Sequence, residues 1–178
     1  MDVREMGIDF GAASTVKWLM GERGFGLLYV REELQERVVA TTRWGHSHLR
    51  QYDQDAMTWA TLPGAARYET GHVAETLVAG ALAGVSYLDR CGVERIAAHA
   101  QRLVDRLQAE LPPLGYVPLT PAGNRSPIVA FRPIVLDDAA GRLRAANIAV
   151  TIAPPNIRVS VSVFNDDDDI DRLVDALS

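Results

Sequence analysis

Residues 7–34 read GIDFGAASTVKWLMGERGFGLLYVREEL, and this stretch decides how the first part of the chain folds. It opens with an apolar run that ends in small residues, which predicts a buried strand leading into a loop. Three glycines then indicate a turn, the run FGLLYV indicates a second strand, and Glu32 is expected to begin a helix. The loop between the two predicted strands carries Lys17.

Lys17 stands out by composition, because it is the only lysine among 18 basic residues and all the others are arginine. A lysine amine can lose its proton when desolvated and attack a carbonyl carbon, whereas a guanidinium stays protonated. The apolar neighbours Val16 and Trp18 predict a half-buried setting of this kind. Two interpretations stay open at this point: a nucleophilic amine, and a lysine that survives by chance.

Two other motifs are weaker. Ser14 and Lys17 match the Ser-x-x-Lys pattern of serine β-lactamases, but the chain has no second lysine and no Ser-x-Asn element, both of which that family needs. His46 and His48 form an isolated His-x-His without a well-spaced third ligand, so we predict no metal site. We assign these histidines to a polar loop over residues 38–63 that covers substrate.

The rest of the chain predicts an α/β beginning followed by an α+β part. Residues 74–90 are apolar nearly all round, which predicts a well-buried helix that ends at Gly92. The run IRVSVSV alternates as a strand with one solvent-exposed face does. The acidic run that begins at Asp166 suits a helix N-terminus. The remaining expected elements are a helix at 93–111, strands at 116–120, 127–133, 148–152 and 157–164, and helices at 137–146 and 167–177.

Composition limits the class of protein. With 178 residues, 48% hydrophobic and 23% charged, the chain is one large domain or two small ones. A net charge of −5 favours neither nucleic acid nor an anionic membrane as a partner. The single cysteine, Cys91, excludes an intrachain disulfide and fits a reducing compartment. No apolar run approaches about 20 residues and the first residues have no signal-peptide core, so we expect a cytoplasmic protein.

Four stretches of the sequence resemble, in order and spacing, the class V aminotransferase family. They are the opening stretch at 7–34, ARYETGH at 66–72, NRSPIVAF at 124–131 and NIRVSVSVFNDDDDIDRLVDAL at 156–177. The family includes cysteine desulfurases, selenocysteine lyases and isopenicillin-N-epimerase-like proteins, all pyridoxal-phosphate (PLP) enzymes of fold type I. The resemblance implies that residues 1–90 are the end of the PLP-binding large domain with a connecting helix. Residues 91–178 are then a small C-terminal α+β domain.

The resemblance also implies roles for four residues. Lys17 matches the catalytic lysine that attaches to PLP and moves the substrate's α-proton. Ser14 matches a serine that binds the PLP phosphate, and His72 replaces the usual threonine that reaches the phosphate of the partner subunit. Arg158 matches the arginine that clamps the substrate's α-carboxylate, a task that suits a planar guanidinium. The alternative for Arg158 is an exposed strand arginine without a specific role.

The sequence departs from the desulfurases of this family at their nucleophilic cysteine. That cysteine lies on a loop shortly before the carboxylate-binding arginine. Here the corresponding stretch is IAVTIAPPNIR, which has no cysteine and no room for a long loop. Cys91 is interpreted as a small buried residue at a helix end. We therefore do not expect persulfide-forming desulfuration.

Two hypotheses for function follow. The first is a homodimeric PLP enzyme of lyase, epimerase or transaminase type that acts on an amino acid, present here as its C-terminal half. The resemblance places the aspartate that pairs with the pyridine nitrogen, and an aromatic residue stacked on the ring, upstream of the chain. The second hypothesis is a non-catalytic remnant or fragment domain without stand-alone activity.

Overall fold

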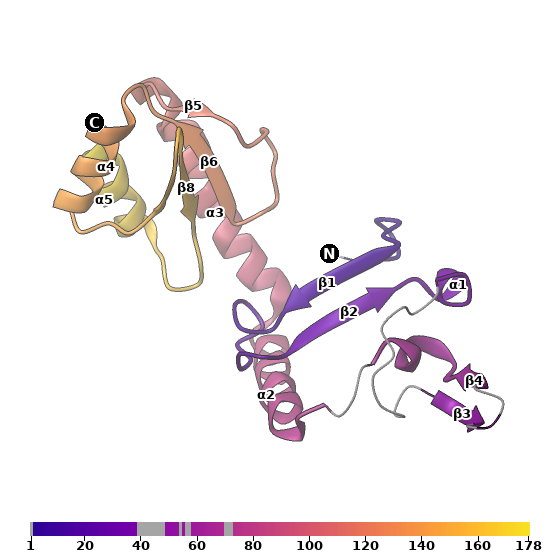
Figure 1. Cartoon of the computed structure of the whole chain (residues 1–178). Helices are drawn as coiled ribbons and strands as arrows, with labels where there is room; N and C mark the ends of the chain where they lie inside the picture. Colours follow the sequence, from indigo (N-terminus) through magenta and orange to yellow (C-terminus); the bar gives the residue numbers. More distant parts are fainter. Residues whose placement is uncertain (1, 39–48, 54, 56–57, 70–72) are drawn as a thin grey trace. The chain divides into compact units, whose positions relative to one another are not determined.

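The computed structural model describes residues 2–38, 49–53, 55, 58–69 and 73–178. The chain divides into two compact units, residues 1–90 and 91–178. Within the described residues, no helix has both the length and the apolar character needed to cross a membrane. The elements in chain order (Figure 1) are β1 (Phe10–Ser14), β2 (Gly26–Val30), α1 (Glu32–Gln35), β3 (Leu49–Asp53), β4 (Thr58–Thr61), the 3₁₀ helix η1 (Gly64–Tyr68), α2 (Glu75–Cys91), α3 (Val93–Glu110), the 3₁₀ helix η2 (Pro112–Leu114), β5 (Val117–Pro118), β6 (Ile128–Arg132), α4 (Leu136–Ala145), β7 (Thr151–Ala153), β8 (Asn156–Ser160) and α5 (Asp167–Leu177).

The first unit begins with an antiparallel pair of strands. β1 and β2 pair so that Phe10 lies opposite Val30 and Ser14 opposite Gly26, and α1 begins at Glu32, as predicted. The expected burial of the first strand is wrong, because Phe10 is 53% exposed. A sheet of two strands has no neighbouring strands, and the described residues leave β1 without a covering layer.

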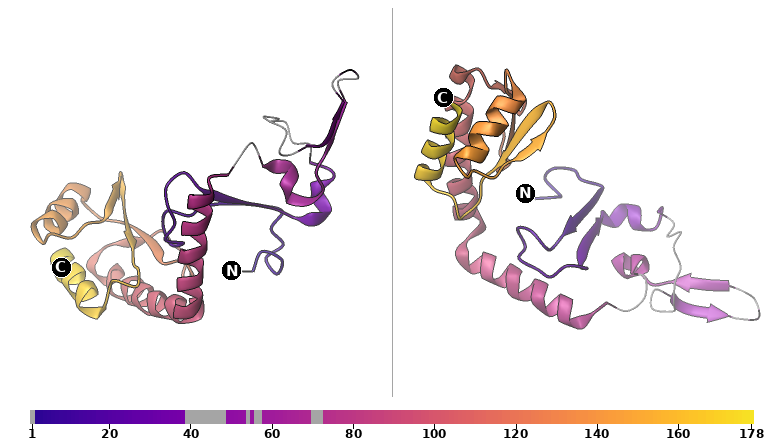
Figure 2. Two further views of the ribbon diagram at one scale, coloured as in Figure 1. Left: turned by 90° about the horizontal axis from the view of Figure 1, so that it is seen from below. Right: turned by 60° about the vertical axis from the view of Figure 1, so that its left-hand side comes forward.

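The predicted loop over residues 38–63 is partly wrong. β3 and β4 form an antiparallel hairpin within it, with Tyr52 opposite Trp59 (Figure 2). Tyrosine and tryptophan are residue types that favour strands, but the polar residues around them hide the alternation that identifies a strand in sequence.

Helix α2 has the expected position but not the expected burial. It ends before Gly92, whose φ of 84° is easily adopted only by glycine. Only Ala81 and Gly84 are buried in it, whereas Val78, Leu82 and Val85 are exposed. These three side chains recur at i, i+4 and i+7, so they form one apolar stripe on a single helix face.

The second unit is a four-stranded antiparallel sheet with α3, α4 and α5 against one face. The strand order is β5-β6-β8-β7. The alternation predicted for the last strand is confirmed over β8, where Ile157 and Val159 are buried while Arg158 and Ser160 are exposed, but the strand ends at Ser160 and not at residue 164. The other face of this sheet carries no helix of the same unit.

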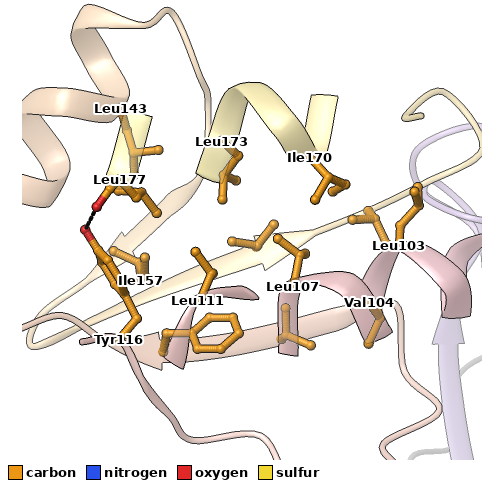
Figure 3. Packing of buried hydrophobic residues seen from close by; sticks show 14 of the residues in the cluster. Leu103, Val104, Leu107, Leu111, Tyr116, Leu143, Ile157, Ile170, Leu173 and Leu177 are labelled. Carbon is orange, nitrogen blue, oxygen red and sulfur yellow. Dashed lines mark hydrogen bonds between the residues drawn. The ribbon is translucent and has the colours of Figure 1, made fainter. Parts of the chain in front are cut away.

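The core of the second unit lies between the sheet and its three helices (Figure 3). Leu103, Val104 and Leu107 of α3 are fully buried, as is Leu111 at its C-cap. The hydroxyl of Tyr116 donates a hydrogen bond of 3.2 Å to the carbonyl oxygen of Leu177, which satisfies a polar group inside the core. Burial raises the pKa of Tyr116 above its usual value.

The acidic run stabilises the start of α5, as predicted. Asp166 is the N-cap, and its side chain accepts the backbone N–H of Asp169 at 3.1 Å. Hydrogen bonds from Arg102 and then Arg106 hold the pKa of Asp167 below its usual value. Negative charge therefore meets both the helix N-terminus and the arginines of α3.

One strand begins later than predicted. β7 covers Thr151–Ala153 rather than residues 148–152. Ile148 and Val150 instead pack against the core as partly buried side chains, while Asn147 has a φ of 56° directly after α4. The apolar residues that suggested a strand at 148–152 therefore begin just after α4 and pack against the core before β7 starts.

Replacing Leu107 with alanine should lower the free energy of unfolding by about 2–5 kcal/mol, because truncating a fully buried leucine leaves a cavity. Val93→Ala is the matched control in the same helix, since Val93 is 55% exposed, and it should change stability by less than about 0.5 kcal/mol. Urea denaturation of the whole chain, followed by circular dichroism, measures both. Equal losses from the two variants would contradict the described core.

Candidate functional site

The loop after β1 places Ser14 and Lys17 close together in the chain. Its backbone folds back on itself, since the N–H of Met20 bonds to the carbonyl of Lys17 at 3.0 Å and that of Gly21 to the carbonyl of Thr15 at 2.8 Å. Lys17 is exposed, so the predicted half-buried setting is wrong for the chain by itself. Within the described residues, no carboxylate forms an ion pair with Lys17.

Thr15 anchors this loop, and the sequence analysis missed it. Its side chain is only 1% exposed. Its hydroxyl oxygen lies 2.9 Å from the carbonyl oxygen of Phe25 and 3.2 Å from that of Glu22, so the hydroxyl hydrogen can bond to either. A buried hydroxyl with such partners ties the start of the loop to its end. Its position between two candidate site residues was the available signal.

Two glycines allow the loop to pack closely. A Cβ at Gly84 of α2 would overlap the carbonyl oxygen of Leu19, so the helix and the loop backbone touch at that point. A Cβ at Gly21 would lie 2.7 Å from the Cβ of Thr15. The small residues of α2 therefore form the surface on which the Lys17 loop rests.

Ser14 has a free hydrogen-bond donor. Its Oγ accepts the backbone N–H of Val16 at 3.4 Å, and its side chain is exposed. A hydroxyl that accepts one hydrogen bond can still donate its own hydrogen. The loop therefore presents a hydroxyl donor and an amine on one short segment.

The Arg67-Tyr68-Glu69 motif secures the end of α1. Arg67 is buried and donates to the carbonyl of Gln35 at 2.7 Å and to the carboxylate of Glu36 at 2.6 Å. The Tyr68 hydroxyl donates to the same Gln35 carbonyl at 3.1 Å. These bonds satisfy carbonyls that a helix end leaves without partners. The predicted phosphate ligand His72 lies outside the described residues.

Arg158 belongs to the second unit, whereas Ser14 and Lys17 belong to the first. It lies on the exposed face of β8 and donates from Nη2 to the hydroxyl of Thr151 on β7 at 3.1 Å. β7 and β8 are joined by Pro154 and Pro155 alone, since Ala153 pairs with Asn156. The predicted absence of a long loop before Arg158 is confirmed.

Metal-ligating residues do not gather in the part of the chain that the structure describes. No group of three or more His, Cys, Asp or Glu side chains there could hold a metal ion. His46 and His48 lie outside the described residues. Cys91, expected to be buried, is half-buried at the last residue of α2 and has a free thiol.

Comparison with known proteins gives a family match. A family model described as aminotransferase class-V matches residues 1–173. The chain is similar to Probable cysteine desulfurase 2 of Mycobacterium leprae, with 29% identity over 98% of this chain and 45% of that protein. It is also similar to Uncharacterized aminotransferase YcbU of Bacillus subtilis, with 26% identity over 100% of this chain and 47% of that protein. The chain thus spans about half the length of the curated relatives it matches.

Solved structures show the same fold. An apo cysteine desulfurase from Thermococcus onnurineus NA1 matches with a TM-score of 0.80 and 24% identity, over 98% of this chain and 47% of that one. A cystine C-S lyase in complex with its product cysteine persulfide matches with a TM-score of 0.78 and 22% identity, over 99% of this chain and 48% of that one. These matches confirm the predicted fold class, the C-terminal part of a fold type I α/β domain followed by an α+β part.

Gly84→Ala should loosen the Lys17 loop, because the added Cβ would push the Leu19 carbonyl away from α2. We expect the Gly21 amide, which bonds to Thr15, to exchange its hydrogen at least about tenfold faster, equivalent to roughly 1.4 kcal/mol of local stability. Hydrogen exchange followed by NMR measures this.

Gly80→Ala is the matched control, one turn earlier in the same helix. Its added Cβ would lie 3.6 Å from the nearest atom, the Cγ of Glu22, which is an ordinary contact. It should leave the exchange of Gly21 unchanged and stabilise α2 by up to about 1 kcal/mol. Similar behaviour of the two variants would show that the close approach at Gly84 is not what holds the loop.

Proposed function

This chain belongs to the aminotransferase class-V family, and from that premise we propose that it forms part of a PLP-dependent enzyme that acts on an amino acid. The observation that supports the proposal most directly is the loop between β1 and β2. There the hydrogen-bonded backbone of the loop holds Lys17, the only lysine of the chain, in an exposed position. The proposal concerns the whole enzyme. This chain spans about half the length of the curated relatives that it matches.

The donor set on this loop fits PLP, which has an aldehyde that reacts with amines and a phosphate that accepts hydrogen bonds. Lys17 supplies an amine without a carboxylate partner in the described residues. The hydroxyl of Ser14 already accepts the N–H of Val16, so its hydrogen is available to a phosphate oxygen. Both groups are exposed on one short segment, which suits an aldehyde and a phosphate arm carried on neighbouring ring carbons.

Each residue then has a distinct role. Lys17 would hold the cofactor and, as a neutral amine, take or return the proton at the substrate's Cα. Ser14, with His72 as a second donor, would bind the phosphate, and Arg158 would orient the α-carboxylate through its two-pronged guanidinium. When bound, PLP supplies an electron sink for the electrons released at Cα.

We propose a lyase, epimerase or transaminase reaction rather than persulfide formation, although several relatives are named cysteine desulfurases. The turn between β7 and β8 consists of two prolines and offers no cysteine close to Arg158. Cys91 is half-buried at the end of α2, in the segment before α3 and far along the chain from Arg158.

We also propose that the working enzyme is a cytoplasmic homodimer. The apolar stripe formed by Val78, Leu82 and Val85 supports association, because such faces are usually covered in a working protein. The single cysteine, which cannot form an intrachain disulfide, supports a reducing compartment.

Lys17→Arg should abolish covalent attachment of PLP, because a guanidinium does not become a neutral nucleophile near pH 7. The chain is incubated with PLP, reduced with borohydride and digested, and mass spectrometry locates the pyridoxyl group. As the only lysine, Lys17 competes with nothing but the α-amino group, so the result is unambiguous. We expect one group per chain, on Lys17.

The control moves the amine within the same loop. The double variant Lys17→Arg, Arg23→Lys keeps one lysine and the net charge but places the amine at another exposed position. It should label much less than the unmodified chain at equal PLP concentration. Equal labelling would show that Lys17 reacts with PLP like any other exposed amine. It would favour the alternative, a domain without stand-alone activity.

Ser14→Ala should weaken PLP binding by about tenfold, because a hydrogen bond to a charged group contributes about 1.5–3 kcal/mol. Ser14→Thr keeps the hydroxyl and should bind nearly as tightly. Titration of the visible absorbance of bound PLP measures both affinities. If alanine and threonine bind PLP equally, the phosphate role of Ser14 is wrong.

A further inference from the structure

Charge is sharply segregated in the second unit, which the structure describes throughout. Its strands carry no acidic residue, and all its acidic residues lie on the three helices or at the N-cap of α5. They are Glu94, Asp105, Glu110, Asp137, Asp138, Asp166, Asp167, Asp168, Asp169, Asp171 and Asp175. The helical layer is therefore acidic, and the sheet face opposite it contains no carboxylate.

The sheet strands carry two basic residues, and both lie on that open face. Arg132 ends β6 and Arg158 lies within β8, both exposed. The neighbours of each along its strand, Phe131 and Ile157, are buried on the helical side. Because Ala130 pairs with Arg158, Arg132 is the diagonal neighbour of Arg158 on the same face, with Cα atoms about 7–8 Å apart. Figure 1 shows β6 and β8 side by side.

Neither guanidinium of this pair has a carboxylate partner within residues 91–178. Four arginines of the helical layer do have one, with N–O distances from 2.5 Å for Arg102 to 3.8 Å for Arg172. Arg158 bonds instead to the hydroxyl of Thr151, and Nε of Arg132 to the side-chain oxygen of Asn156 at 3.4 Å. Neutral partners orient these side chains without neutralising their charge, which leaves two guanidiniums able to bind anions.

We propose that Arg132 is a second carboxylate-binding residue, so that the substrate is an amino acid whose side chain also ends in a carboxylate. Arg158 would bind the α-carboxylate and Arg132 the side-chain carboxylate. This rests on the proposed function, because it takes the role of Arg158 from there. The sheet fixes the spacing of the two Cα atoms, and the bonds to Thr151 and Asn156 orient the side chains, which together favour a substrate side chain of matching length. Two fork-shaped donors on one rigid face recognise a dicarboxylate better than a monocarboxylate.

The test compares succinate, a four-carbon dicarboxylate, with butyrate, a monocarboxylate with the same number of carbons. Binding of each to the whole 178-residue chain at low salt is followed by NMR of the arginine Nε–H groups. We expect succinate to bind about threefold to fivefold more tightly than butyrate, the upper part of the range for one additional exposed ion pair. The shifts should involve both Arg132 and Arg158.

Arg132→Gln should abolish the preference for succinate, while butyrate, which uses one guanidinium, should still bind at Arg158 within about twofold of its original affinity. Arg144→Gln is the matched control, since it removes one exposed positive charge from α4, and it should keep the preference. Arg132→Lys keeps the charge but loses the fork, so it should retain only part of the preference. Circular dichroism confirms that each variant remains folded.

Two results would overturn the proposal. One is an unchanged preference for succinate in Arg132→Gln, and the other is an equal loss in Arg144→Gln, which would indicate general electrostatics. Both leave the proposed function intact, because that depends on the labelling of Lys17. Loss of Lys17 labelling with the succinate preference retained would instead refute the PLP role and keep the two-arginine face.

Discussion

The position of Lys17 depends on a contact in which a helix and a loop backbone meet with no side chain between them. Gly84 lets α2 approach the carbonyl of Leu19, and Thr15 bonds across the loop to the carbonyl of Phe25, the residue before β2. The loop is therefore held at two points while the lysine side chain extends into solvent. A fixed backbone with a free amine is what a covalently held cofactor requires, since the attachment atom must be accessible and its Cα must not move.

The two units differ in how completely they bury their apolar residues. In the second unit the sheet and three helices enclose a continuous core, and Leu103, Leu107 and Phe131 have no exposed surface. The first unit leaves Phe10 and Leu82 more than half exposed. Burial of apolar surface is the main stabilising contribution in a folded protein, so we expect the second unit to be the more stable part. The exposed apolar residues of the first unit are those that the proposed homodimer would cover.

The sequence predicted the elements whose evidence is local. Helices α3 and α5 lie close to their predicted bounds, the start of α5 was predicted from its acidic run, and the exposed face of β8 from residue-by-residue alternation. The burial of α2 was predicted wrongly, because periodicity shows which face is apolar but not what covers it. The hairpin of β3 and β4 was missed because backbone pairing needs no apolar pattern. The contact between Gly84 and Leu19 joins residues far apart in the chain, and no local pattern indicates it.

The separation of charge in the second unit affects the rate at which small anions associate with it. Carboxylates on the helical layer and guanidiniums on the opposite sheet face give this unit a permanent electric dipole, with its positive end at Arg132 and Arg158. The field attracts a small diffusing anion toward that end and orients it before contact, which raises the association rate constant. Dissolved ions screen this field over about 8 Å at physiological ionic strength. The association rate of an anion therefore depends on ionic strength as well as on the fit of the ligand.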